Sequence, residues 1–354
     1  MTAGPDPTEL FNVAEFEAAA RAILPPINYQ RVAGGAGSGS TVSRNREAFD
    51  DWLFRPRVLV DVSGRDTSTT VLGHRLDFPA IVAPVAQQAV LHPDAELATA
   101  GAATEAGLAM AVSMGASRSL EEIASVAECP LWFQPYASDD REVYTELVGR
   151  AHSAGYTAIC MSVDAPVGGW READMRGQAV LPEGSGWPNM PSEYQPGVGK
   201  WLSGSSFDWV DLEWLIGMSP LPVVVKGVFD PRDAVRAADL GAAALIVSNH
   251  GGRQLGDAIG CLDALPAVRE AVDPEIEVLV DGGVRRGTDI AKALALGAKA
   301  VLLGRSVAWG LAVAGREGVS RVLSLLRGEF DSTLANLGAP SVADLGADHL
   351  VKRR

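Results

Sequence analysis

The chain has 354 residues and a formal net charge of −14, from 30 Lys and Arg against 44 Asp and Glu. This acidic balance argues against a broad surface for nucleic acid or for an anionic membrane. With 47% hydrophobic residues, the composition is that of a globular protein. Three scattered cysteines, Cys129, Cys160 and Cys261, form neither a disulfide framework nor a zinc-site spacing. We therefore expect reduced cysteines and no bound metal.

The N-terminal residues contain no basic segment followed by an apolar core, so they do not resemble a secretory signal. Nowhere does an apolar run approach the roughly 18 residues that a membrane-spanning helix needs. We expect a cytoplasmic protein that does not associate with membranes.

Residues 1–75 show no regular alternation of strand and helix patterns. They contain one amphipathic helical pattern near Ala14–Leu24 and a glycine-rich stretch at residues 34–39. We expect a helical and irregular N-terminal extension.

From residue 79 onward, short apolar runs alternate with helical patterns at intervals of roughly 20 to 30 residues. Eight of these runs predict strands: Ala80–Ala83, Ala109–Ser113, Leu131–Pro135, Ala158–Val163, Val223–Lys226, Ala244–Ser248, Glu277–Asp281 and Ala300–Leu303. The clearest helical patterns are Asp94–Glu105, Arg141–Ala154, Pro231–Leu240 and Thr288–Leu296. Gly107, Gly155, Gly241 and Gly297 mark their C-terminal ends.

A unit of strand, helix and glycine that repeats eight times is typical of a parallel barrel, whose strands are buried on both faces. The sequence therefore predicts the α/β class and a (β/α)₈ TIM barrel, as a single domain over residues 1–354. An open doubly wound sheet is the alternative.

Residues 168–208 form a long insertion after the fourth predicted strand. The segment is rich in Gly, Pro and Ser, and five tryptophans lie in or beside it: Trp170, Trp187, Trp201, Trp209 and Trp214. Loops that follow barrel strands lie on the catalytic face. We expect a lid-like active-site loop, with a plain surface loop as the alternative.

Glycines and arginines follow the last two predicted strands. The seventh strand runs into Asp281-Gly282-Gly283-Val284-Arg285, and the eighth runs into Gly304-Arg305. Glycine lets the backbone approach a ligand, and the following helix N-terminus offers free amides. Arg285 and Arg305 suit bidentate contact with a phosphate. This pair of loops predicts a phosphate site.

Polar groups also end the third to sixth strands. They are Gln134 and Tyr136, then Ser162 and Asp164, then Lys226, and finally Ser248 and His250, with Arg253 close behind. A histidine at this rim is placed to act as a base, and Asp164 could orient it. Arg253 and Arg171 could hold a carboxylate. A barrel with a purely structural role has no need for such a rim.

These residues resemble the FMN-dependent L-2-hydroxy acid oxidases and dehydrogenases, the family that oxidises glycolate, lactate and mandelate. The resemblance extends from about residue 14 to residue 345, nearly the whole chain. Its most specific blocks are Ser248–Leu255 and Asp281–Gly297. It implies an FMN cofactor held by this single barrel domain.

The resemblance implies a role for each matching position. The backbone amide of Ala86 would lie near flavin N5, and Lys226 would stabilise the reduced ring near N1 and O2. Ser113, Gln134 and Ser162 would hydrogen-bond the ring edge, Gly283, Arg285, Gly304 and Arg305 would bind the phosphate, and Ser248 and Asp281 would complete the cofactor site.

The resemblance also implies a reaction. His250, paired with Asp164, would be the base, while Arg253 and Arg171 would bind the substrate carboxylate and Tyr136 the reacting oxygen. A 2-hydroxy acid would become a 2-keto acid as the flavin accepts two electrons. The sequence does not distinguish hydride transfer from a carbanion route.

Three positions depart from the family pattern. Arg31 occupies the place of a tyrosine that binds the substrate carboxylate, Gly115 that of a bulky aromatic residue, and Gly256 that of an aspartate. We count Arg31 with the substrate-binding residues and read Gly115 as a sign of a roomier pocket. Together they predict a bulky or specialised carboxylate substrate.

Several alternatives stay open at this point. The same base could serve oxidation of an amine, an amino acid or a peptide-derived substrate. Less favoured are a non-redox FMN isomerase and a flavin-binding protein without activity. The electron acceptor is oxygen or a separate carrier. The resemblance further suggests a homo-oligomer, a tetramer or larger.

Overall fold

Eight short parallel strands form a closed barrel in the computed structural model, which describes residues 5–138, 140–177, 180, 182–183, 186–190 and 206–353. The strands are β4 (Ala80–Val82), β5 (Ala109–Ser113), β6 (Leu131–Gln134), β7 (Ala158–Ser162), β8 (Val223–Val228), β9 (Ala244–Val247), β10 (Glu277–Val280) and β11 (Val301–Leu303). Pairing of β11 with β4 closes the barrel. The predicted TIM barrel is confirmed, and the open sheet is excluded.

The strands are short apolar runs because both of their faces are covered. In β9 all four residues, Ala-Leu-Ile-Val, are buried, and β5 and β7 are buried along their whole length. β-Branched and aliphatic side chains suit such strands, since one face packs inside the barrel and the other against helices.

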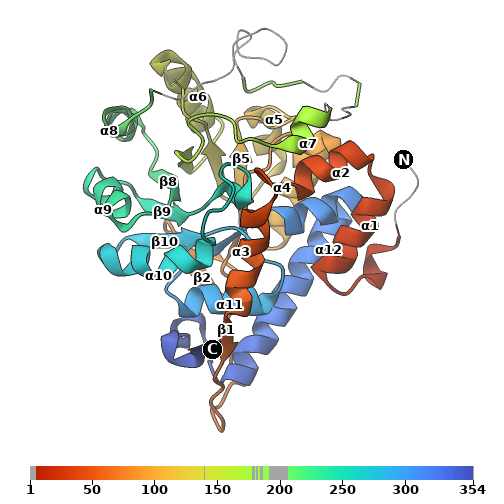
Figure 1. Ribbon diagram of the computed structural model, residues 1–354, viewed down its shortest axis with the longest axis vertical. Coiled ribbons are helices and arrows are strands. Elements are labelled where there is room, and N and C mark those ends of the chain that lie inside the picture. The colour runs from red at the N-terminus through yellow and green to blue at the C-terminus, as the bar shows by residue number, and fades with distance from the viewer. Residues whose placement is uncertain are drawn as a thin grey trace.

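Helices surround the barrel, and Figure 1 shows α8, α9 and α10 on one side and α12 on the other. Their bounds are α4 (Ala95–Glu105), α5 (Leu120–Val126), α6 (Arg141–Ser153), α8 (Trp209–Met218), α9 (Pro231–Asp239), α10 (Cys261–Ala271), α11 (Gly287–Ala295) and α12 (Arg305–Leu337). α12 bends sharply at Ala314 and Gly315. The predicted glycine positions at the helix C-termini are confirmed. Gly297, for example, has a φ of +100°, a conformation that favours glycine.

The N-terminal extension is more regular than the sequence predicted. α1 (Val13–Ile23) matches the predicted helix, but α2 (Pro26–Ala33) and α3 (Ser40–Asp50) follow it. Short strands complete the extension and the C-terminus: β1 (Trp52–Phe54) pairs with β12 (Leu350–Lys352), and β2 (Thr69–Val71) pairs with β3 (His74–Leu76). Within the described residues, five 3₁₀ helices lie at Pro7–Glu9, Gln88–Val90, His250–Gly252, Val342–Asp344 and Ala347–His349.

The extension reaches the barrel rim. The backbone N–H of Ala36 donates to the carbonyl of Gly252 at 2.8 Å, and the Thr41 hydroxyl donates to the carbonyl of Leu255 at 2.8 Å. Both acceptors belong to the loop that follows β9, so the extension helps to shape the catalytic face.

The long insertion follows β7, as predicted. It contains α7 (Glu172–Arg176), which packs beside α2 (Figure 1). Trp209 and Trp214 belong to α8, and Trp201 lies outside the described residues. Over the part of the chain that the structure describes, no helix is both long and apolar enough to cross a membrane.

Candidate active site

Polar side chains gather at the carboxyl ends of the barrel strands. Parallel pairing sets Ser113 of β5 beside Gln134 of β6, and Ser162 of β7 beside Lys226 of β8. All four are buried, with exposed fractions of 3% or less. Parallel strands end at one rim, so the predicted site residues of these strands do come together.

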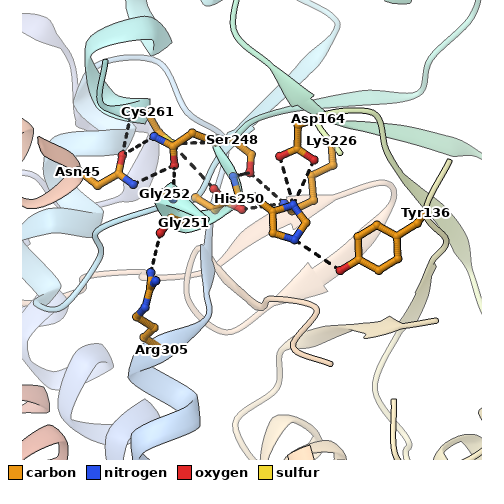
Figure 2. Close-up of polar contacts among 12 residues, drawn as sticks. Asn45, Tyr136, Asp164, Lys226, Ser248, His250, Gly251, Gly252, Cys261 and Arg305 are labelled. Carbon is orange, nitrogen blue, oxygen red and sulfur yellow. Dashed lines mark hydrogen bonds and ion pairs between the residues drawn. The ribbon is translucent and has the colours of Figure 1, made fainter. Parts of the chain in front are cut away.

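His250 lies between an acid and a phenol (Figure 2). Its Nδ1 is 3.1 Å and 3.2 Å from the two Asp164 oxygens, and its Nε2 is 3.4 Å from the Tyr136 hydroxyl. The Tyr136 and His250 rings stack with centroids 5.9 Å apart. Because Asp164 accepts a hydrogen bond from Nδ1–H, Nε2 of neutral His250 is left as the proton acceptor.

A turn with left-handed backbone at His250 orients its ring. His250 has a φ of +58°, and its N–H donates to the Ser248 hydroxyl at 3.1 Å. Asn249 and Asn45 exchange a pair of amide hydrogen bonds, each 2.8 Å long, which ties the turn to α3. Left-handed backbone at a non-glycine residue is uncommon and persists where the surroundings hold it. Sequence reasoning missed Asn45, since no local pattern marks it.

Lys226 is buried beside Asp281, another predicted cofactor residue. Its Nζ is 3.2 Å from Asp281 Oδ2 and donates to the Ser248 hydroxyl at 2.9 Å. Burial opposes the charge of Lys226, but Asp281 and Asp164 outweigh it and raise the pKa of Lys226 above its usual range. Lys226 is therefore a fixed cation at the rim.

The loops after β10 and β11 bring Arg285 and Arg305 together. Among the residues that the structure describes, Arg305 donates only to backbone carbonyls, those of Val32, Gly34 and Gly251, at 2.7–2.8 Å. The Arg285 guanidinium donates to the carbonyl of Val284. Within the described residues neither guanidinium forms an ion pair with a carboxylate. Removal from water, with the nearby arginines, lowers the pKa of Arg305 to about 9. Such a pair of cations suits an anion.

Three further arginines lie near one another, and one of them, Arg253, lies near Tyr136. Arg253 donates to the carbonyls of Arg31 and Gly34, at 2.6 Å and 3.3 Å. Burial, together with the charges of Arg171 and Arg31, lowers the pKa of Arg253 to about 10. Arg171 is 2.9 Å from Asp174 in an ion pair. The structure thus places Arg31, Arg171 and Arg253 in one electrostatic neighbourhood.

Comparisons with known proteins agree on one family. The family described as FMN-dependent dehydrogenase matches residues 20–352. L-lactate oxidase from Nostoc sp. is 45% identical, over 99% of this chain and all of its own, and glycolate oxidase 1 of Zea mays is 44% identical over 97% and 96%. A soluble mutant of the membrane-associated (S)-mandelate dehydrogenase from Pseudomonas putida superposes with a TM-score of 0.91, at 38% identity over 97% of this chain and all of its own.

The chain belongs to the FMN-dependent dehydrogenase family. It is therefore an FMN flavoprotein and an oxidoreductase of the 2-hydroxy acid oxidase family, whose members act on CH–OH groups. The resemblance found in the sequence is confirmed. No cluster of three His, Cys, Asp or Glu side chains suited to a metal ion occurs in the described ranges.

The site fits the FMN of this dehydrogenase family. Ser162 is fully buried, and its hydroxyl has no hydrogen-bond partner among the described residues. A buried hydroxyl without a partner is costly, so a ligand that bonds it is expected. Lys226 is a buried cation, and Arg285 and Arg305 are neighbouring guanidiniums whose charge suits a phosphate.

Asp164 makes the stability of the folded protein depend on pH in the acid range. Burial disfavours its charge, but His250 and Lys226 outweigh burial and hold the pKa of Asp164 below its usual value of 3.8. The ionised carboxylate therefore stabilises the folded state above about pH 4, and this contribution is lost as the pH falls through the folded pKa. We expect the free energy of unfolding to fall less steeply below about pH 4 in Asp164→Asn than in the parent.

Chemical denaturation at a series of pH values measures this difference. The exposed Asp239→Asn is the matched control and should follow the parent curve. Equal slopes for the parent and Asp164→Asn would contradict a strong His250–Asp164 pair.

The pocket beside Gly115 is not as open as the sequence suggested. A Cβ at Gly115 would lie 3.1 Å from Trp187 Cζ3, because the loop after β7 brings Trp187 against this glycine. The expectation of a roomier pocket is therefore wrong at this position. The third departure, Gly256, lies beside the backbone of Ala36, 3.6 Å from where its Cβ would be.

Proposed function

We propose that this protein oxidises a 2-hydroxy acid to a 2-keto acid, with FMN as the two-electron acceptor. The observation that carries the proposal is the placement of His250 between Asp164 and Tyr136, with Arg253 nearby. This set combines a base, a hydroxyl donor and a carboxylate receptor, the three groups that a 2-hydroxy acid requires.

Arg253 and Arg171 would bind the substrate carboxylate, and the Tyr136 hydroxyl would donate to the substrate oxygen. Burial raises the pKa of Tyr136, partly offset by Lys226 and by a hydrogen bond with Ser113, so the phenol stays protonated as a donor. His250 Nε2 would remove one proton, from the hydroxyl or from the α-carbon. The resulting imidazolium would be stabilised by Asp164.

The cofactor residues fall into two groups. Ala86, Ser113, Gln134, Ser162 and Lys226 would hold the flavin ring, Gly283, Arg285, Gly304 and Arg305 would hold the phosphate, and Ser248 and Asp281 would complete the cofactor site. When bound, FMN supplies the acceptor for the two electrons that leave the substrate carbon. Oxidation of the carbinol to a ketone releases two electrons and two protons. His250 would take one proton. The other would leave with the electron pair as hydride to the bound cofactor, or, in the carbanion route, would leave the hydroxyl as the electron pair passes to the cofactor.

The arginines favour a bulky or strongly anionic substrate. Arg31 stands where the resemblance expects an uncharged tyrosine, and it adds positive charge beside Arg253. In the described part of the chain no carboxylate forms an ion pair with Arg31. A substrate with a second anionic group, or a large acid, would use this charge, whereas glycolate would not.

Anaerobic titration of the holoenzyme tests the function. We expect 2-hydroxy acids to bleach the flavin absorbance near 450 nm, with aryl or dianionic acids reacting faster than glycolate and lactate. Matched amines and amino acids belong in the same panel, since faster bleaching by them would move the activity to C–N oxidation. An intact flavin spectrum that no acid or amine bleaches would contradict the proposal and favour a non-redox role.

We also propose oxygen as the acceptor, supported by the two relatives named oxidases, and a cytoplasmic homo-oligomer of four or more copies. The rate of flavin reoxidation after oxygen is added to the reduced enzyme tests the acceptor. Size-exclusion chromatography tests the oligomeric state, and cell fractionation tests the location. A separate carrier is the acceptor if oxygen reoxidises the flavin slowly.

A further inference from the structure

Trp187 covers the position that lacks a side chain at Gly115. A Cβ at Gly115 would lie 3.0 Å from Ala86 Cβ, 3.1 Å from Trp187 Cζ3 and 3.7 Å from Ser113 Oγ. Gly115 follows β5, whereas Trp187 belongs to the loop after β7, so the indole reaches this spot from a different element. Glycine at 115 is what leaves room for it.

This spot borders the candidate active site. The Ser113 hydroxyl accepts from the N–H of Gly115 at 3.1 Å and lies near Tyr136, whose hydroxyl is 3.4 Å from His250 Nε2. Ala86, which follows β4, also lies beside Gly115. Trp187 therefore lies beside Gly115, which neighbours both Ala86 of the proposed flavin-binding segment and Ser113, the residue near Tyr136.

Buried amide side chains hold the loop around Trp187. Gln87, 1% exposed, donates from Nε2 to the carbonyl of Gly186 at 3.1 Å, and its N–H donates to the carbonyl of Gly115 at 2.9 Å. Asn189, fully buried, accepts from the N–H of Leu120 at 2.9 Å. Gln87 and Asn189 thus fix the backbone on both sides of Trp187.

Asn189 makes a second backbone contact, from Nδ2 to the carbonyl of Arg118 at 2.8 Å. Farther back along the loop, Asn28 and Val180 exchange two hydrogen bonds, at 2.8 Å and 2.9 Å. Buried amides that bond the backbone of distant segments give a loop one preferred position, which a passive surface loop does not need.

We propose that Trp187 is a specificity-determining residue, the aromatic wall of the substrate pocket, supplied by the loop after β7 in place of a side chain at position 115. The wall selects acids with a flat aryl side chain, because aromatic faces pack on an indole more favourably than a short alkyl group does. The inference rests on the proposed function, since it concerns that substrate.

Binding of acids that cannot be oxidised tests the role of Trp187 independently of the oxidation reaction. Phenylacetate and acetate lack the hydroxyl, so each can be titrated into the oxidised holoenzyme while the flavin spectrum reports binding. Trp187→Leu is expected to weaken phenylacetate roughly tenfold and acetate less than about twofold. Trp170→Leu, in the same loop but 70% exposed, is the matched control and should change neither.

A swap of the two positions tests the contact itself. Gly115→Trp alone should be destabilised, because its side chain meets Trp187 and Ala86. Adding Trp187→Gly should restore stability and the preference for phenylacetate.

The aromatic wall is contradicted if Trp187→Leu still binds flavin and keeps the parent ratio of the dissociation constants for phenylacetate and acetate. The contact between position 115 and Trp187 is contradicted if Gly115→Trp has the same free energy of unfolding as the parent. 2-Hydroxy acids that bind but never bleach the parent flavin would instead count against the proposed oxidation.

Discussion

His250→Asn is expected to slow reduction of the flavin by substrate by about 10²- to 10⁴-fold, the usual contribution of a positioned base. The reason is the arrangement around the ring, in which Asp164 holds Nδ1 and leaves Nε2 to accept the proton. Asparagine suits this position because it tolerates the φ of +58° that His250 adopts, whereas alanine would add backbone strain. Single-turnover mixing without oxygen measures the rate.

The flavin content of His250→Asn should match that of the parent, since His250 is not among the proposed cofactor ligands. Tyr136→Phe is the companion variant. It keeps the ring that stacks on His250 but removes the hydroxyl, so a smaller loss of rate is expected. If His250→Asn reduces its flavin at the parent rate, His250 is not the base, and the proton must pass to another group.

The barrel could be predicted closely from sequence because its strands are continuous apolar runs. The buried run Ala244–Val247 needs no knowledge of its neighbours to be read as a strand. The rim residues followed from the same argument, since a polar group just after such a run must lie at the carboxyl end. His250, Asp164 and Lys226 were found in this way.

α3 escaped prediction for the opposite reason. Its residues Ser-Thr-Val-Ser-Arg-Asn-Arg-Glu give little apolar periodicity, and the helix is held by distant partners. Arg44 pairs with Asp263 at 2.6 Å, and Asn45 pairs with Asn249. No local pattern records such contacts, because each depends on a residue more than half the chain away.

Trp187 shows a second limit of sequence reasoning. Gly115 was correctly seen to lack a side chain, but the conclusion that space opens there ignored a loop that returns from elsewhere in the chain. The number of tryptophans in the insertion was the available signal. It pointed to the loop as functional without saying which ring enters the site.

Lys226→Met is expected to destabilise the folded protein by about 3–5 kcal/mol and to weaken flavin binding. Asp281, 6% exposed, would keep its charge in a buried place without its cation, 3.2 Å away in the parent. The Ser248 hydroxyl would also lose a donor. Urea denaturation of the flavin-free protein separates this cost from that of a lost cofactor, because bound FMN would itself stabilise the fold.

The double variant Lys226→Met/Asp281→Asn distinguishes a structural lysine from one that acts on the flavin. Neutralising Asp281 removes the unpaired buried charge, so most of the unfolding free energy should return. If Lys226 also stabilises the reduced flavin, the flavin of the double variant should keep a lower reduction potential and slow reduction by substrate. Recovery of both stability and potential would assign Lys226 a purely structural role, as the partner of Asp281.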